Sequence, residues 1–273
     1  MNNTNMNKTA INPYSIRNKM RKNRYILGAI VTKNFKSQYR NSILGVVWTV
    51  LNPLLNMIVM ALIFSEMFGV SSGVGNYPVY LFCGNLIFSI MRQATSQSLT
   101  SIVDNSGLIK KVRISYSVFP ISNTCLSLVN FGMSFIALLG IMVFEGQKFH
   151  WTMVLTLTII PAVLMFSLGL GLILASLYVF FRDVKHIYSV VLTLWTYLTP
   201  LFYTAESLKK PVIIKIIKLN PMTQYVKMFR DIIQWGTIPS WGTFLYAYGF
   251  ALAMWGIGYL FYRLLRKKFI LYI

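Results

Sequence analysis

Acidic residues are scarce in this chain of 273 residues. Only 6 Asp and Glu stand against 26 Lys and Arg, which gives a formal net charge of +20, and charged residues make up only 12% of the sequence. Soluble domains carry about 25% charged residues, so a large soluble enzyme is excluded. The 56% hydrophobic content excludes a disordered basic tail. A nucleic-acid binder would carry its basic residues on polar faces rather than between long apolar runs, so no nucleic acid is expected as a partner.

Cysteine and histidine are also rare. Cys83 and Cys125 both lie in apolar stretches, where a thiol behaves as a small hydrophobe. His150 and His186 are far apart in the chain, and neither has a ligand-like neighbour. The sequence therefore predicts no disulfide and no metal site.

Two further absences restrict the chemistry. The chain contains no Gly-Lys dipeptide and hence no phosphate-binding loop, so it cannot hydrolyse ATP itself and needs no cofactor of its own. The six carboxylates are not paired at helical spacing, which argues against a membrane-embedded glycosyltransferase. A secondary transporter should show buried acidic relays and an inverted repeat, and neither is found.

Long segments without charge dominate the remainder. A bilayer core about 30 Å thick is crossed by about 20 apolar helical residues. The charge-free runs predict an all-α integral membrane protein with six transmembrane helices, at 43–67, 78–102, 116–144, 152–180, 186–204 and 240–263. These helices form a permease domain over 43–263, between an N-terminal segment (1–42) and a tail (264–273).

The positions of Lys and Arg predict the orientation. Basic residues gather before the first span and after the second, fourth and sixth, whereas the loop after the first span has none and the loop after the third has only Lys148. Because cytoplasmic loops are enriched in Lys and Arg, both termini are expected in the cytoplasm.

Residues 205–239 should lie outside, yet this segment is basic and has periodic apolar positions. Asn220-Pro221 fits a helix N-cap followed by proline in the first turn. We expect two short amphipathic helices here that re-enter the outer leaflet and form an outer gate.

The N-terminal segment contains a second amphipathic pattern. Apolar residues recur every four positions, at Leu27, Val31, Phe35 and Tyr39. Lys33, Lys36 and Arg40 surround the other face, which is typical of a helix lying in the membrane surface. A solvated basic leader that binds anionic lipid is the alternative.

Short motifs follow one another along the chain. They are YRNSILGVVW (39–48), NP (52–53), IFSEMFG (63–69), LIKKVRIS (108–115), FFRDV (180–184), LTPLFY (198–203), LNP (219–221) and FRD (229–231). In this order the chain resembles, over about residues 24–270, the type-2 ABC exporter permeases that export O-antigen, capsular polysaccharide and teichoic acid. Two departures are that Pro120 follows the basic motif only after Ser115 to Phe119, and that the tail lacks an acidic residue.

The resemblance implies a transport subunit in the bacterial plasma membrane. It would be half of a homodimeric channel for a lipid-linked polysaccharide or teichoic-acid-like polymer, driven by a separate ATP-binding subunit in a 2:2 assembly. ATP and Mg²⁺ would then be bound by the partner chain. A permease for a drug or another small lipid-like molecule is the alternative with the same fold.

A partner ATPase needs a cytoplasmic contact surface. The segment 104–115 is the leading candidate for a coupling helix, and the interface helix is the second. The docking residues would be Leu108, Ile109, Lys110, Lys111, Val112 and Arg113. The basic residues in this set are also explained by the enrichment of Lys and Arg in cytoplasmic loops, without any docking role.

A glycan needs a continuous lumen, because unpaired hydroxyls cost several kcal/mol in hydrocarbon. Aromatic rings bind the apolar faces of sugars, although Trp and Tyr also gather at membrane interfaces in any membrane protein. The candidate lining residues are Trp48, Phe88, Trp195, Tyr197, Phe202 and Tyr203. Arg92 lies roughly 20 Å into its helix at 1.5 Å per residue and could contact an anionic substrate, snorkel or form an interhelical bond.

Other residues are expected to have structural roles. Arg182 and Asp183 can fix helix ends by charge-assisted hydrogen bonds, and Pro200 should kink the end of the fifth span. A small-residue repeat at Ser167, Gly171 and Ala175 predicts the close approach of another helix.

Overall fold

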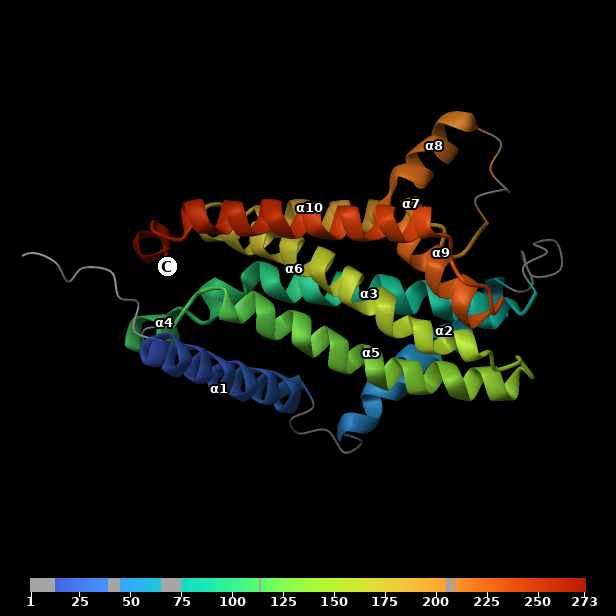
Figure 1. Cartoon of the computed structure of the whole chain (residues 1–273), viewed down its shortest axis with the longest axis horizontal. Coiled ribbons are helices and arrows are strands. Elements are labelled where there is room, and N and C mark those ends of the chain that lie inside the picture. The colour runs from blue at the N-terminus through green and yellow to red at the C-terminus, as the bar shows by residue number, and fades with distance from the viewer. Residues whose placement is uncertain (1–12, 39–44, 65–74, 113, 205–207, 209) are drawn as a thin grey trace, which may run out of the picture.

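A computed structural model describes residues 13–38, 45–64, 75–112, 114–204, 208 and 210–273. All regular secondary structure in these ranges is helical, so the all-α prediction is confirmed for them (Figure 1). The helices are α1 (Pro13–Gln38), α2 (Trp48–Phe64), α3 (Tyr77–Asp104), α4 (Ser106–Lys111), α5 (Val118–Phe144), α6 (Thr156–Phe180), α7 (Val184–Leu198), α8 (Pro211–Leu219), α9 (Pro221–Ile233) and α10 (Trp241–Leu265). Short 3-10 turns lie at Gly45–Val47, Trp151–Leu155 and Phe269–Leu271.

Polar caps determine where three of these helices begin. The side chains of Asn76, Asn220 and Ser240 accept hydrogen bonds from backbone N–H groups in the first turns of α3, α9 and α10. Proline also stands in the first turn of α3 and α9, where the missing N–H has no partner to lose. The Asn220-Pro221 signal in the sequence is therefore a real helix start.

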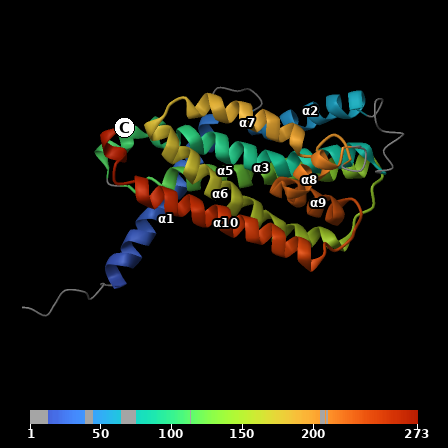
Figure 2. The same cartoon turned by 90° about the horizontal axis from the view of Figure 1, so that it is seen from above.

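The central helix of the bundle is α3, which packs along α5 and α6, while α10 lies along the outer side of α6 (Figures 1 and 2). Helix α1 lies against α5 at the end of the bundle where α4 and the C-terminus are also found (Figure 1). We call this the α4 end, and the opposite one, where α9 packs, the α9 end.

The α4 end collects basic residues from distant parts of the chain. Arg182, which precedes α7, donates a hydrogen bond to the carbonyl of Tyr272, and the Tyr262 hydroxyl lies 3.2 Å from the N–H of Ser117. These contacts bring three basic segments to one end of the bundle: Lys110 and Lys111, Arg182 and Lys185, and Arg263 to Lys268. This clustering is what the cytoplasmic charge bias predicts for one membrane face.

Three helical segments in the described residues are long and apolar enough to cross a bilayer, at Val118–Phe144, Trp151–Phe180 and Trp241–Leu265. The predicted spans 43–67 and 186–204 contain shorter helices, because α2 has 17 residues and α7 has 15. Helix α3, with 28 residues, is long enough, but polar side chains lower its hydropathy. The count of six spans stays a prediction.

The two helices expected in 205–239 are present, and they differ in burial. In α9 the residues Tyr225, Val226 and Phe229 are fully buried against the bundle. Helix α8 projects away from it (Figure 1), and Val212, Ile216 and Leu219 are exposed. Helix α8 therefore contributes one buried residue, Ile217, whereas α9 is buried along most of its length.

Candidate functional site

One face of α3 is polar along most of its length. Asn85, Ser89, Arg92, Ser96 and Thr100 recur every three or four residues and keep exposed surface, whereas most other positions of α3 are buried. Such a face is costly against hydrocarbon, because its hydroxyls and amides would lose their hydrogen bonds to water. The polar face of α3 is therefore suited to line an aqueous path.

Arg92 stands in the middle of this face. Its guanidinium carbon lies 5.3 Å from the ring centroid of Phe88, a cation–π distance. Among the described residues no hydrogen bond or ion pair engages the Arg92 guanidinium, so the interhelical bond considered from the sequence is not formed there. Its donors remain available to a ligand.

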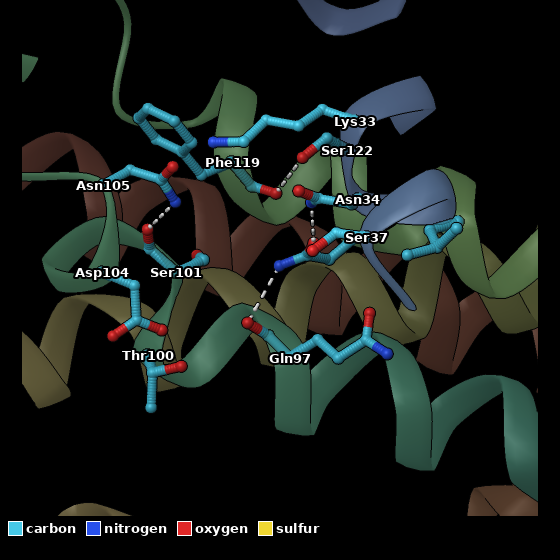
Figure 3. Close-up of a pocket in the computed structure, with 12 residues that line it drawn as sticks. Lys33, Asn34, Ser37, Gln97, Thr100, Ser101, Asp104, Asn105, Phe119 and Ser122 are labelled. Atoms are coloured by element: carbon cyan, nitrogen blue, oxygen red, sulfur yellow. Dashed lines mark hydrogen bonds between the residues drawn. The ribbon is translucent and has the colours of Figure 1, made fainter. Parts of the chain in front are cut away.

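The polar face leads into a cavity of about 530 Å³ toward the α4 end. Helices α1, α3 and α5 line it, and the lining is polar except for Phe119 and Leu126 (Figure 3). The polar members are Lys33, Asn34, Ser37, Gln97, Thr100, Ser101, Asp104, Asn105, Ser122 and Asn123. We call this cavity the polar pocket.

A chain of amide hydrogen bonds joins the three helices around the polar pocket. Asn34 on α1 donates to Oδ1 of Asn123 on α5 at 3.2 Å, and Asn123 donates to the carbonyl of Gln97 on α3 at 2.9 Å (Figure 3). Further along, Asn130 donates to Oε1 of Gln93 at 2.7 Å. Helix α1 is thus held to the bundle by a polar contact as well as by the packing of Ile30.

The aromatic residues proposed for the channel do not form one group. Phe88 has no exposed surface, so in this structure it belongs to the core of the bundle rather than to a lining. Trp195 is half-buried, and its Nε1 donates to Oδ1 of Asn220 at 2.9 Å. Tyr197 is 66% exposed, and its carbonyl accepts a hydrogen bond from the Tyr203 hydroxyl at 2.8 Å. Trp48 and Phe202 are half-buried.

Trp195 also lines an apolar cavity of about 470 Å³ between α7 and the start of α9. Its other members include Val191, Leu194 and Leu198 of α7, and Ile216 and Leu219 of α8. The aromatic and apolar candidates of 195–203 thus lie near the α9 end, away from the polar pocket.

Arg230 on α9 is a buried cation, although in the sequence it is only one of the basic residues of segment 205–239. It is 5% exposed, and its side chain donates three hydrogen bonds to carbonyl oxygens. The acceptors are Tyr80 at 3.1 Å, Pro200 at 2.8 Å and Leu201 at 2.9 Å. The guanidinium carbon also lies 3.4 Å from the centroid of the Tyr80 ring. The signal was present, since Arg230 falls on the same helical face as Val226 and Ile233.

The segment that follows α7 has its carbonyls bound one after another. Arg230 binds those of Pro200 and Leu201, the Tyr77 hydroxyl donates to Phe202 O at 2.7 Å, and the Tyr80 hydroxyl donates to Tyr203 O at 3.0 Å. Irregular backbone at membrane depth requires such partners. Pro200 does end the helix, because α7 stops at Leu198, and α3 and α9 satisfy the backbone groups that this frees.

The predicted docking segment forms the short helix α4. Ile109 is buried, whereas Leu108, Lys110, Lys111 and Val112 are exposed. Arg113 lies outside the described residues. Helix α4 therefore presents two lysines and two aliphatic side chains at the α4 end, which is a suitable contact surface for another chain.

The predicted interface helix is part of α1. Leu27, Val31 and Phe35 are half-buried, and Leu27 packs with Ile30 against a cluster that includes Phe119. Tyr39 and Arg40 lie outside the described residues. Lys33 and Lys36 are exposed on the other side, in agreement with an amphipathic helix.

Arg182 makes charge-assisted hydrogen bonds at the end of α6. Its guanidinium donates to the carbonyls of Tyr178 and Tyr272, both at 3.3 Å, and lies 5.1 Å from the Tyr178 ring centroid. Arg182 and Asp183, both described, form no ion pair with each other. The link joins the end of α6 to the C-terminal segment.

A helical bundle with apolar outer helices and a polar face on its central helix is the arrangement expected of a membrane transport protein. The chain belongs to the ABC-2 type transporter family, whose model matches residues 25–233. It is an ABC-2 type permease, as the motifs indicated.

The relatives have names from polysaccharide export. The chain is 32% identical to the O-antigen export system permease protein RfbA of Myxococcus xanthus, over 80% of this chain and 83% of that protein. It is 28% identical to the protein of the same name from Klebsiella pneumoniae, over 85% of this chain and 89% of that one. The polysialic acid transport protein KpsM of Escherichia coli is 22% identical over 86% of this chain and 91% of its own length.

Proposed function

We propose that this chain is the permease subunit of an ATP-driven exporter that moves a lipid-linked polysaccharide or teichoic-acid-like polymer out across the bacterial plasma membrane. The similarity to O-antigen export permeases over four-fifths of the chain carries this proposal. The polar face of α3 supports it, because a polymer of hydroxylated sugars needs hydrogen-bonding partners along its whole path.

The assembly we propose contains two copies of this chain, six spans in each, with both termini in the cytoplasm. In a single protomer the polar face of α3 keeps exposed surface, and this surface would face lipid. Helix α7 presents an apolar side nearby, with Ile187, Val190 and Leu194 exposed. A second copy packed against such apolar sides would close a hydrated conduit between two polar faces.

The polar face of α3 is testable by cysteine accessibility. In a background with Cys83→Ala and Cys125→Ala, we expect Ser89→Cys, Ser96→Cys and Thr100→Cys to react with a membrane-impermeant thiosulfonate. Controls are Leu252→Cys and Leu260→Cys on α10, which are 56% and 58% exposed and would face lipid. Because the thiolate is the reacting form and hydrocarbon disfavours charge, the controls should react at least about tenfold more slowly.

Equal reaction rates at the two sets of positions in the assembled transporter would contradict an aqueous path along α3. Rates should be measured in membranes, with and without nucleotide, by mass shift of the purified chain.

We further propose that ATP and Mg²⁺ are bound by a separate subunit that docks on α4. Lys110→Glu with Lys111→Glu should lower polymer export by about tenfold or more, because like charges placed across an interface cost several kcal/mol. The matched control is Lys267→Glu with Lys268→Glu, two exposed lysines at the same end of the bundle. Co-purification of the ATPase and export are measured together, and normal docking of the α4 variant would remove this surface from the contact.

A further inference from the structure

Four of the polar groups around the polar pocket have no hydrogen-bond or ion-pair partner in the described part of the chain. Among the described residues, no hydrogen bond or ion pair engages the Lys33 ammonium, the Asp104 carboxylate, the side-chain amide of Gln97 or the Thr100 hydroxyl. Apart from Ser37, the other polar residues of the lining are occupied; for example, Asn105 donates to Ser101 O and Ser122 to Phe119 O (Figure 3). The free groups comprise a cation, an anion, an amide and a hydroxyl.

These groups match one class of ligand. A lysine ammonium binds a phosphate as a point charge. The Asp104 carboxylate can only accept hydrogen bonds, and sugar hydroxyls can donate them. The Gln97 amide and the Thr100 hydroxyl both donate and accept, as ring hydroxyls require. A cavity of about 530 Å³ lies in the range of small-molecule sites. A purely apolar ligand such as an acyl chain would leave all four groups unpaired.

The position of the pocket agrees with a ligand carried by a lipid. One wall is α1, whose apolar face rests on the bundle while Lys33 and Lys36 are exposed. The other end of the pocket continues into the polar face of α3, because Thr100 belongs to both. A headgroup bound here would therefore lie at the start of the polar path.

We propose that the polar pocket binds the sugar–phosphate head of the lipid-linked glycan before it enters the conduit. Lys33 holds the phosphate, and Asp104, Gln97 and Thr100 hold hydroxyls of the first sugar. This assignment rests on the proposed function, and it makes the polar pocket the site where the exported molecule first binds.

Photocrosslinking tests the proposal without a transport assay. The assembled transporter, with benzoylphenylalanine in place of Ser37, is mixed with phosphatidylglycerol vesicles that contain polyisoprenyl diphosphate N-acetylglucosamine. We expect a crosslink at position 37 that Lys33→Gln weakens by about tenfold in apparent affinity, the loss of one hydrogen bond to a charged group. Lys36→Gln is the matched control, because Lys36 is exposed on the same helix but does not line the pocket.

Asp104→Asn should also weaken the crosslink, because an amide replaces two acceptors by one. Soluble N-acetylglucosamine 1-phosphate forms the second arm of the experiment. A crosslink to the soluble compound with no crosslink to the vesicle-bound lipid would overturn the lipid-linked source. No crosslink to either probe, or equal weakening by Lys36→Gln, would overturn the site.

Failure of the site can be told from failure of the proposed function. If the pocket variants bind the probe and export polymer as the wild-type transporter does, only the assignment of the pocket is lost. If the wild-type transporter neither binds the probe nor exports any glycan, the proposed function is lost with it.

Discussion

Arg230→Met should reduce the yield of folded protein more than any other substitution of a charged residue in the described part of the chain. It removes the three hydrogen bonds from the guanidinium to the carbonyls of Tyr80, Pro200 and Leu201, at about 1.5–3 kcal/mol for each bond to a charged group. The melting temperature in detergent and the fraction of monodisperse protein measure the loss. Lys227→Met is the matched control, because Lys227 is exposed on the same helix, and it should melt close to wild type.

Gly84 allows an independent test of the same contact. A Cβ at Gly84 would overlap the Arg230 Nη2 atom and would pass 3.2 Å from its Cζ. Gly84→Ala should therefore displace the guanidinium and weaken its bond to Leu201 O without removing the charge. In the double variant with Arg230→Met the two losses should not add, because both act through one contact.

Export should fall together with stability in these variants, because the segment 200–203 is attached to α3 and α9 through this network. A stable Arg230→Met protein with unchanged export would show that the carbonyls find other donors. Arg230→Lys should recover only part of the stability, since an ammonium lacks the planar fork that reaches three carbonyls.

The helices were predictable because apolar runs and caps are local properties. All six predicted spans contain helices, and α3, α5 and α10 begin and end within two residues of the expected bounds. The span expected at 186–204 is shorter, as α7 ends at Leu198, two residues before Pro200. Pro200 predicts the end of the helix, and the residue before a proline also avoids the helical region, which moves the end back to Leu198.

The site was less predictable, because it depends on which helical faces meet. The aromatic candidates came from composition, and composition gives no burial, so Phe88 was proposed for a lining although it is fully buried. The polar face of α3 could have been found, since Asn85, Ser89, Arg92 and Ser96 already stand at helical spacing. The polar pocket could not, because its walls come from three helices far apart in the sequence.

Small residues show the same limit within one helix. The repeat at Ser167, Gly171 and Ala175 predicted a close helix contact, and a Cβ at Gly171 would lie 3.1 Å from the side chain of Ser98 on α3. The tighter approach is on the other side of α6, between Gly169 and Gly258 of α10. Gly169 does not belong to a small-residue repeat within α6. The contact between Gly169 and Gly258 is therefore seen only in the packed structure of the two helices.

Gly258→Val should therefore detach α10 from the bundle. A Cβ at Gly258 would overlap the carbonyl of Gly169 and lie 2.8 Å from its Cα, so the obstacle is backbone and cannot rotate away. Helix α10 has few other buried positions, namely Ala247, Ala251 and Tyr262, so little else compensates. The loss in free energy of unfolding should exceed about 1–3 kcal/mol, which is the usual cost of overpacking a core.

Gly256→Val is the matched control, because the same substitution in the same helix meets no atom within 4 Å. Both changes carry the same β-branched helix propensity, so their difference isolates the contact with Gly169. We expect Gly256→Val to elute as a monodisperse complex and Gly258→Val to be lost or aggregated, by size-exclusion chromatography of fluorescent fusions. If both variants elute alike, α6 and α10 do not pack backbone to backbone, and the polar face of α3 would have to be enclosed by a different arrangement of the outer helices.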